Sequence, residues 1–361
     1  MRGSGVLGAR PLIIAGIVIV AIVVGIVLVA TSEEPRSLPP EPAVDVGFNN
    51  NAVTQGVATA EQAAERLVQV GADIDRVQIN WATLEPSPGV YDFRPYDEVY
   101  AADLAAGVKP LLIFAYAPAW AADDYCDANV SSCHLPPTPA HYGDAARTVA
   151  AITERYPEAA GIEIWNEPNI AYFWAPGADP VAYAALLEVT ADAVKRVDPE
   201  MPVVGGSTSS TEVMGRPGYI DAVEFIDAIY AQGAAEAIDA LSVHIYTYPG
   251  PPSVKAALEQ VAEIRAIQRE HEDDAPIWVT ETGASTTGPE AVSESEQRRF
   301  LEALVDRLGR AGGVEMVLLH TLFRRSTDLH DPEVGYGIVD PGGEPLPIFC
   351  RLAELWRGSG C

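Results

Sequence analysis

Basic residues are scarce in this chain of 361 residues, in which 23 lysines and arginines stand against 51 aspartates and glutamates. The formal net charge is −28. Proteins bind a phosphate backbone with clustered cations, and the sequence holds no basic run, so we exclude nucleic acid as a partner. The same excess of negative charge disfavours polyanionic glycans as substrates. We interpret the acidity as a solvated surface that keeps the protein soluble.

Cysteine is also rare, with four residues in two near-neighbour pairs: Cys126, Cys133, Cys350 and Cys361. Four cysteines allow three pairings, and the sequence does not decide among them. Local pairing is the simplest, and two such disulfides would fit an exported domain in an oxidising compartment. Cys133 precedes His134, but no second cluster of ligands accompanies them. We therefore expect no metal site and no cofactor.

A glycine-rich phosphate turn is absent too, which disfavours the doubly wound open sheet that is the structural alternative here. From Val44 to Trp356, short apolar segments alternate with longer amphipathic ones, the pattern of repeated strand–helix units and a parallel sheet. Eight strands are predicted, at Val44–Phe48, Arg76–Ile79, Pro110–Phe114, Ile162–Trp165, Pro202–Gly205, Ala240–Tyr246, Ile277–Glu281 and Val314–His320. Eight such units close a barrel, so we predict the α/β class and a single (β/α)8 TIM barrel over residues 43–361.

Eight helical patterns separate and follow these strands. They are Thr59–Val70, Tyr96–Ala106, Thr138–Arg155, Pro180–Val197, Ile220–Gln232, Ser253–Glu270, Ser293–Leu308 and Pro347–Trp356. Three of them open with a side chain suited to capping: Thr138 before a proline, Asp179 before a proline, and Ser293 with Glu296.

An uncharged apolar run, residues 11–30, precedes the predicted barrel. It matches a bilayer-spanning helix of ~20 residues, and it exceeds the ~7–15 apolar residues of a signal peptide. Arg2 and Arg10 precede the run, and Glu33 follows it. This charge pattern predicts a cytoplasmic segment over residues 1–10 and an anchor in the lipid bilayer over residues 11–30.

Residues 31–42, rich in proline and glutamate, are predicted to be a semi-rigid linker. The protein would then lie in the cell membrane with a single pass, its N-terminus in the cytoplasm and its barrel extracellular. The alternative is a secreted protein, cleaved at the small residues Ala30-Thr31-Ser32.

Two predicted strands end on a glutamate and then break into a polar turn, at Glu167 and at Glu281. Strands of a parallel barrel all open on one face at their carboxyl ends, so we expect the two carboxyl groups to meet there. Glycosidic cleavage needs such a pair: one group protonates the leaving oxygen, and the other attacks the anomeric carbon or activates water. The sequence therefore predicts a hydrolase of O-glycosyl bonds (EC 3.2.1 class).

The neighbours of the two glutamates suggest different roles. Trp165 and the turn at Pro168 limit the solvation of Glu167, which favours a protonated acid. Glu281 must be ionised to attack, and Arg76 at the start of the second strand is the expected cation. Glu163 has the same inward parity as Glu167 but lies deeper, so we expect it to pair with a cation.

Polar and aromatic rings follow several strands on the same predicted face. His244 and Tyr246 share one side of the sixth strand, so one could hydrogen-bond the nucleophile and the other a sugar hydroxyl. Sugar rings stack on aromatic side chains, and five of these follow strand ends: Trp81, Tyr116, Trp120, Tyr172 and Trp174. Trp278 has the opposite parity to Glu281 and is expected to pack against the helices.

Four segments carry a family resemblance: Trp165-Asn166-Glu167-Pro168; Thr280-Glu281-Thr282-Gly283; Arg76 with Trp81 and residues 85–92; and residues 335–340 with 342–347. On these the chain resembles the clan A glycoside hydrolases, β/α barrels with catalytic glutamates on strands four and seven. Within the clan it looks most like family 39 and related hydrolases of envelope polysaccharides and exopolysaccharides. The likeness runs from Val44 to Trp356.

The resemblance implies a retaining double displacement. Glu281 would be the nucleophile, Glu167 the acid and base, and Asn166 a contact of the 2-hydroxyl of the sugar. The chain departs from the clan at the end of strand eight, where His320 takes the place of an aromatic platform. We expect His320 to lie in the innermost sugar site.

The leading hypothesis is thus a retaining β-glycoside hydrolase that acts outside the membrane on a poly- or oligosaccharide. A non-catalytic glycan-binding barrel of the cell envelope is the alternative from another class. Transglycosylation would use the same residues. The sugar, the linkage, endo or exo action and the oligomeric state stay open.

Overall fold

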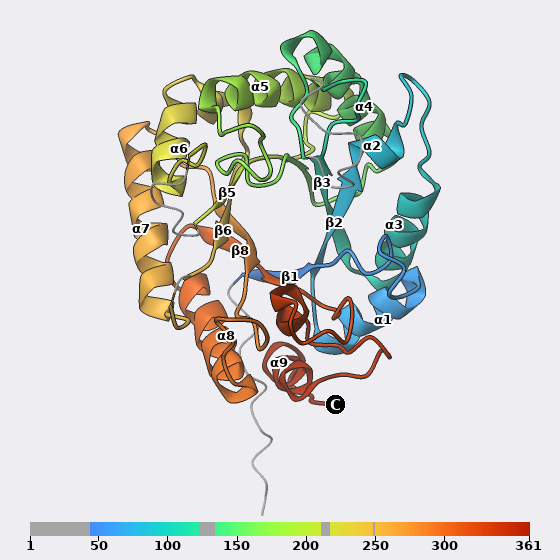
Figure 1. Cartoon of the computed structure of the whole chain (residues 1–361), viewed down its shortest axis with the longest axis vertical. Coiled ribbons are helices and arrows are strands. Elements are labelled where there is room, and N and C mark those ends of the chain that lie inside the picture. Colours follow the sequence, from blue (N-terminus) through green and yellow to red (C-terminus); the bar gives the residue numbers. More distant parts are fainter. Residues whose placement is uncertain (1–43, 123–133, 211–216, 248–249) are drawn as a thin grey trace, which may run out of the picture. The chain divides into compact units, whose positions relative to one another are not determined.

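A computed structural model of the chain describes residues 44–122, 134–210, 217–247 and 250–361. Eight parallel strands pair in chain order and close into a barrel in which β1 also pairs with β8 (Figure 1). They are β1 Asp45–Asn49, β2 Ile74–Asn80, β3 Lys109–Ala115, β4 Gly161–Ile164, β5 Val203–Ser209, β6 Ala240–Ile245, β7 Ile277–Thr282 and β8 Val314–His320. All eight predicted strands, and the barrel they were predicted to form, are confirmed.

The helices surround the barrel (Figure 1). They are α1 Ala60–Val70, α2 Trp81–Leu84, α3 Arg94–Ala106, α4 Tyr142–Arg155, α5 Pro180–Val197, α6 Ala222–Tyr230, α7 Val254–Glu270, α8 Glu294–Gly309 and α9 Pro347–Arg357. Short 3-10 helices add η1 Pro139–His141, η2 Ala234–Ala237 and η3 Pro332–Tyr336. The eight predicted helices are confirmed, whereas the short α2 was not predicted.

Two of the three predicted caps are present. Asp179 accepts from two backbone N–H groups at the start of α5, and Ser293 forms a reciprocal capping box with Glu296 at the start of α8. Thr138 was predicted to cap the fourth segment, but it precedes η1 and makes no side-chain cap hydrogen bond there, and α4 itself begins after His141.

The anchor predicted for residues 11–30 lies outside the described residues, as do the cytoplasmic segment 1–10, the linker 31–42 and the alternative cleavage site. Within the ranges described, no helix has the length and the apolar character needed to cross a membrane. Cys126 and Cys133 also fall outside these ranges. The disulfide between Cys350 of α9 and Cys361 is present, which confirms that predicted pair.

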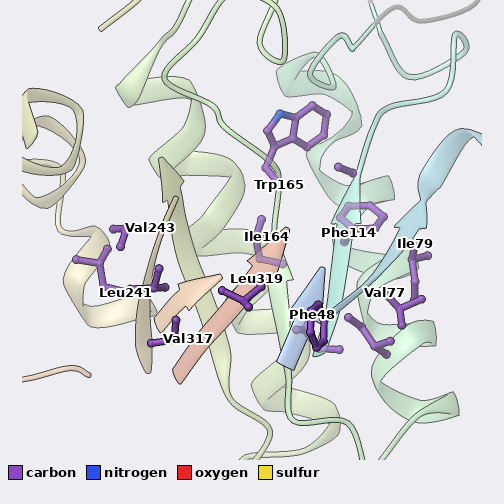
Figure 2. Close-up of a cluster of buried hydrophobic side chains, with 14 of the residues drawn as sticks. Phe48, Val77, Ile79, Phe114, Ile164, Trp165, Leu241, Val243, Val317 and Leu319 are labelled. Carbon is purple, nitrogen blue, oxygen red and sulfur yellow. The ribbon is translucent and has the colours of Figure 1, made fainter. Parts of the chain in front are cut away.

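Side chains along each strand alternate between the outside and the inside of the barrel, and this builds two apolar layers. Outer side chains such as Val77, Ile79 and Leu319 pack beneath the helices in a large buried cluster (Figure 2). A smaller cluster of buried residues from alternate positions fills one end of the barrel interior: Ile74, Leu111, Val204, Ala240, Met316 and Leu318. Toward the carboxyl ends of the strands, many interior positions are polar and buried, among them Arg76, Glu163 and His244.

An irregularity in β7 changes which side chains reach the interior. Val243 pairs with Val279, but His244 pairs with Glu281, so β7 holds one extra residue at Thr280. Both Thr280 and Glu281 therefore make contacts inside the barrel. Trp278 packs against the interior cluster, so its prediction as a helix-facing residue is wrong. That prediction counted parity back from Glu281 and assumed an unbroken strand.

Two carboxyl groups are buried where β2 meets α3. Burial, with the like charge of Asp103 added, raises the pKa of Asp75 well above its usual range. Burial raises the pKa of Asp103 to about 7. A carboxyl group whose pKa is raised on folding keeps its proton where the unfolded chain has lost it, so stability falls as the pH rises. The loss develops between the usual aspartate pKa of 3.8 and about 7.

We expect Asp103→Asn to raise the free energy of unfolding at alkaline pH, because the variant need not ionise this buried group. At alkaline pH the gain should approach roughly 1.4 kcal/mol for each unit by which folding raises the pKa of Asp103. Urea titrations at acid, neutral and alkaline pH measure it, with Glu98→Gln, an exposed change on the same helix, as the control. A variant whose stability declines with pH as steeply as that of the unmodified chain would contradict this account.

Candidate active site

The carboxyl end of β4 is held in an unusual backbone conformation. Trp165 and Glu167 have φ angles of 72° and 46°, in the left-handed region that side chains other than glycine rarely adopt. Hydrogen bonds from Trp165 N to Phe114 O (2.9 Å) and from Glu167 N to Ser207 O (2.9 Å) tie this turn to the neighbouring strands. Such strained positions persist where the surroundings fix them, and they are common at functional sites.

Glu167 lies at the end of this turn, and only 8% of it is exposed. Its Oε1 lies 2.9 Å from Nδ1 of His244, which is fully buried. Asn166 beside it is also buried, and its Oδ1 accepts from Nη2 of Arg76 at 3.4 Å. Glu167 is therefore fixed by the barrel wall and not by a surface loop.

Glu281 on β7 is held by donors from β1, from β2 and from the residue that follows β6. Its Oε1 accepts from Asn49 Nδ2 and from Arg76 Nη1, both at 2.7 Å, and its Oε2 accepts from the Tyr246 hydroxyl at 3.1 Å. Burial raises the pKa of Glu281, but the charges of His244 and Arg76, with smaller contributions from His320 and Tyr246, outweigh it and hold the pKa at about 2. Glu281 is ionised at neutral pH, as predicted.

The two glutamates meet in one place. A carboxylate oxygen of Glu167, one of Glu281 and a ring nitrogen of His244 all lie within 4.8 Å of one another. Retaining glycosidases place their two carboxyl groups ~5–5.5 Å apart, whereas inverting enzymes leave ~6.5–9.5 Å for a water molecule. The separation therefore fits direct attack. The same three atoms could ligate a cation, but the guanidinium of Arg76 already supplies positive charge to Glu281.

Arg76 and Glu163 form a buried base beneath the two glutamates. Arg76 Nε lies 2.5 Å from Glu163 Oε2, and both side chains are almost fully buried. Oε1 of Glu163 accepts from the hydroxyl groups of Ser207, Ser242 and Thr280. Burial alone would raise the pKa of Glu163. The charge and hydrogen bond of Arg76, with smaller contributions from His244 and Ser207, lower it by more, so the net pKa is lowered. Glu163 is thus structural, and the prediction that it pairs with a cation is confirmed.

The two rings of the sixth strand both reach the glutamates. Tyr246 donates to Glu281, the predicted nucleophile, as one of the pair was expected to do. His244 is fully buried. Its Nδ1 lies 2.9 Å from Glu167 Oε1, and its Nε2 lies 3.4 Å from Arg76 Nη2. It cannot offer a ring nitrogen to a sugar hydroxyl without losing one of these contacts, so its prediction as a substrate contact is wrong. It holds the side chain of Glu167 instead.

Two of the predicted sugar platforms are buried. Trp81 is fully buried in α2, where its Nε1 donates to Glu85 Oε2 at 2.6 Å. Trp174 is 2% exposed and packs edge-on against Trp165 and Tyr183. Neither presents a ring face to solvent, so the structure contradicts their prediction as platforms. The sequence held a signal for Trp81, because Glu85 follows it by one helical turn.

The other predicted platforms differ in exposure. Trp120 is half-buried and donates to the Glu85 carbonyl at 3.0 Å. Tyr116 is 6% exposed and stacks on Phe173, and its pKa is raised by burial and by the nearby Glu167 and Glu281. Tyr172 is 56% exposed. Tyr116 therefore lies near the two glutamates, and Tyr172 is the most exposed of these three rings.

We expect Trp81→Phe to lower the free energy of unfolding by about 1–3 kcal/mol, the cost of leaving a buried acceptor without one of its donors. The Michaelis constant for any substrate should not change, because the ring does not face the pocket. Chemical denaturation and steady-state kinetics measure the two quantities. A raised Michaelis constant with unchanged stability would restore Trp81 as a sugar platform.

His320 ends β8, as predicted. Its side chain is 20% exposed, its Nδ1 lies 3.2 Å from Asn49 Nδ2, and its Nε2 lies 3.0 Å from Glu333 Oε2. Its ring packs edge-on against Tyr336. Neither Asn49 nor Glu333 was predicted from the sequence, although Asn49 could have been found as the last residue of the first strand, level with the other strand ends.

A closed barrel with one glutamate after β4 and another on β7 is the arrangement expected of the clan A glycoside hydrolases, which the chain resembles. Residues 154–301 match the family described as Glycosyl hydrolases family 39.

Individual relatives agree with this placement. The chain is 28% identical over 293 residues to a β-xylosidase of Geobacillus stearothermophilus, covering 72% of this chain but only 55% of that protein. This chain therefore spans about half the length of the curated relative that it matches.

Solved structures show the same fold. A family 39 glycoside hydrolase from the gut symbiont Bacteroides cellulosilyticus WH2 superposes with a TM-score of 0.69 at 22% identity, over 87% of this chain and 63% of that one. A family 39 β-xylosidase from Caulobacter crescentus gives 0.64 at 23%, over 89% and 73%. A family 5, subfamily 18 protein from Streptomyces cattleya gives 0.66 at 17%, over 87% and 80%.

Proposed function

We propose that the chain is a retaining β-glycoside hydrolase that cleaves a poly- or oligosaccharide outside the membrane. The observation that carries the proposal is the approach of Glu167 and Glu281 to within 4.8 Å. The ionised state of Glu281 supports it, because a nucleophile must carry its charge before attack. This close approach supports double displacement, in which the two carboxyl groups lie ~5–5.5 Å apart.

The contacts suggest a division of labour. Oε1 of Glu281 is held by Asn49 and Arg76, while Oε2 accepts, among the described residues, from Tyr246 alone, so we take Oε2 as the oxygen that attacks the anomeric carbon. As the new C–O bond forms, the bond to the leaving oxygen breaks, and Glu167 gives that oxygen its proton. Water then attacks the glycosyl ester, Glu167 takes the water proton, and Glu281 leaves. Asn166, next to Glu167 in the sequence, is the residue that we propose contacts the sugar 2-hydroxyl.

Product stereochemistry tests the mechanism. A panel of β-linked aryl glycosides should be offered first, β-xylosides included because one relative is named a β-xylosidase. Proton NMR of the earliest product should show the β-anomer, and the α-anomer would contradict a retaining mechanism. The glycan-binding alternative predicts binding without turnover. Transglycosylation predicts products longer than the substrate when an acceptor sugar is added.

We also propose that residues 11–30 anchor the barrel in the cell membrane. The length of this apolar run and the arginines before it support the proposal. Cell fractionation of the chain with and without its first 30 residues tests it. Recovery of the full chain in the membrane fraction, accessible to external protease, would agree. A full-length chain that is soluble without cleavage would contradict both the anchor and the secretion alternative.

A further inference from the structure

A chain of hydrogen-bonding groups leads from the half-exposed Glu333 to the nucleophile. Glu333 Oε2 lies 3.0 Å from Nε2 of His320, whose Nδ1 lies 3.2 Å from Nδ2 of Asn49. The same Asn49 nitrogen donates to Oε1 of Glu281 at 2.7 Å. Three elements contribute, since Asn49 ends β1, His320 ends β8 and Glu333 belongs to η3.

Hydrogen-bonding rules fix the direction of this chain. If the Asn49 amide were turned over, its oxygen would face a carboxylate oxygen of Glu281, and neither could donate. The amide nitrogen therefore faces Glu281 and gives its second hydrogen to His320 Nδ1. That contact requires Nδ1 to be an acceptor, so the ring proton lies on Nε2 and is donated to Glu333. Asn49 Oδ1 is buried without a hydrogen-bond partner among the described residues, so the two contacts of Nδ2 alone hold the amide.

We propose that His320 and Glu333 are positioning residues of the nucleophile: through Asn49 they hold the Glu281 carboxylate in place, and protonation of the imidazole releases this support. The inference rests on the proposed function, in which Glu281 attacks the sugar. Both ring nitrogens of His320 are occupied, so the ring has no free donor for a sugar hydroxyl. Its place at the end of β8 is thus used to orient a carboxylate.

Protonation reverses one contact of the chain. An imidazolium carries a proton on Nδ1, which cannot accept from Asn49, so the amide must turn its unpartnered oxygen toward the ring and give up Glu281. The charged and titratable groups facing His320 are Glu333 and Tyr336 of η3, Glu281 of β7 and Arg76 of β2. Burial lowers the pKa of His320, but the hydrogen bond to Glu333 and the charge of Glu281 raise it more, so the net pKa is raised. The support is therefore lost as the pH falls through this raised value.

The tautomer of His320 tests this series of hydrogen bonds, and the measurement does not depend on turnover. Nitrogen NMR of the histidine rings at alkaline pH, with His320→Phe to assign the signal, should show neutral His320 protonated on Nε2. A ring protonated on Nδ1 would overturn the proposal, because Asn49 could then not donate to it. In Glu333→Gln the same signal should titrate at lower pH. An unchanged titration would also contradict the proposed series of hydrogen bonds.

Kinetics test the positioning role. In His320→Phe, which keeps a ring against Tyr336, and in Glu333→Gln, we expect kcat to fall about tenfold with little change in KM, the effect of loosening one hydrogen bond to a charged group. In the unmodified protein, kcat should fall as the pH drops through the pKa of His320. This step in the pH profile of kcat should be missing from His320→Phe. Glu290→Gln, an exposed charge removal in the loop after β7, is the matched control and should behave as the unmodified chain.

The outcomes separate this inference from the proposed function. If turnover depends on Glu281 but both variants keep the unmodified kcat and pH profile, the positioning role is wrong and the proposed function stands. If the protein shows no turnover that depends on Glu281, the proposed function fails. The tautomer seen by NMR still decides whether the hydrogen bonds from Glu333 to Glu281 exist.

Discussion

Glu281→Gln should lower kcat by about 10⁴-fold or more, the scale on which removal of a nucleophile acts in enzymes that form covalent intermediates. The amide has no charge to attack the anomeric carbon, yet its oxygen can still accept from Asn49 and Arg76, so the fold should survive. Turnover of a reactive aryl β-glycoside measures the loss. Substrate binding should persist, which calorimetry with an unreactive oligosaccharide checks.

A control of the same chemical kind is available on the barrel itself. Glu315 lies near the start of β8, exposed at the opposite end of the strand from the active site, and Glu315→Gln should leave turnover unchanged. The nucleophile assignment would be refuted if Glu281→Gln kept a substantial part of the unmodified activity. Equal losses in both variants would point to a general effect on the fold.

Glu167→Gln should have an effect that depends on the leaving group. For a sugar leaving group, which needs a proton, we expect kcat/KM to fall by about 10²–10⁴-fold, the usual contribution of general acid catalysis. For an aryl leaving group that departs as a stable anion, kcat/KM should change much less, while kcat falls because no base activates water in the second step.

Added azide provides the matching positive test. Because azide attacks without a general base, it should restore turnover of the aryl substrate by Glu167→Gln and yield the β-glycosyl azide. The same salt should not rescue Glu281→Gln through this β-product. An acid role for Glu167 is excluded if the variant loses the same factor on aryl and sugar leaving groups and azide has no effect.

Much of the fold could be predicted because the signals are local. Strand and helix patterns alternate along the chain, and the capping residues at Asp179 and Ser293 mark helix starts that the structure contains. The pairing of Arg76 with both Glu163 and Glu281 was also accessible, because a buried arginine in a barrel requires carboxylates. These inferences needed only strand parity and the cost of burying a charge.

The errors arose where contacts between distant segments decide the outcome. Strand parity misplaced Trp278 because the extra residue Thr280 in β7 cannot be seen without its neighbours β6 and β8. Aromatic residues after strand ends were all predicted to face a ligand, yet Trp81 is covered in the folded chain and bonds Glu85. The role of His320 depends on Asn49, which lies 271 residues away in the sequence.

The central claim is that Glu281 attacks the sugar while Glu167 lies beside it, and trapping the covalent intermediate tests it most directly. A 2-deoxy-2-fluoro β-glycoside of an accepted sugar, with a reactive leaving group, should inactivate the chain over time. Mass spectrometry of the digested protein should then find one glycosyl group, esterified to Glu281. A label on Glu163 or another carboxylate, or turnover to the inverted anomer without any label, would contradict the account.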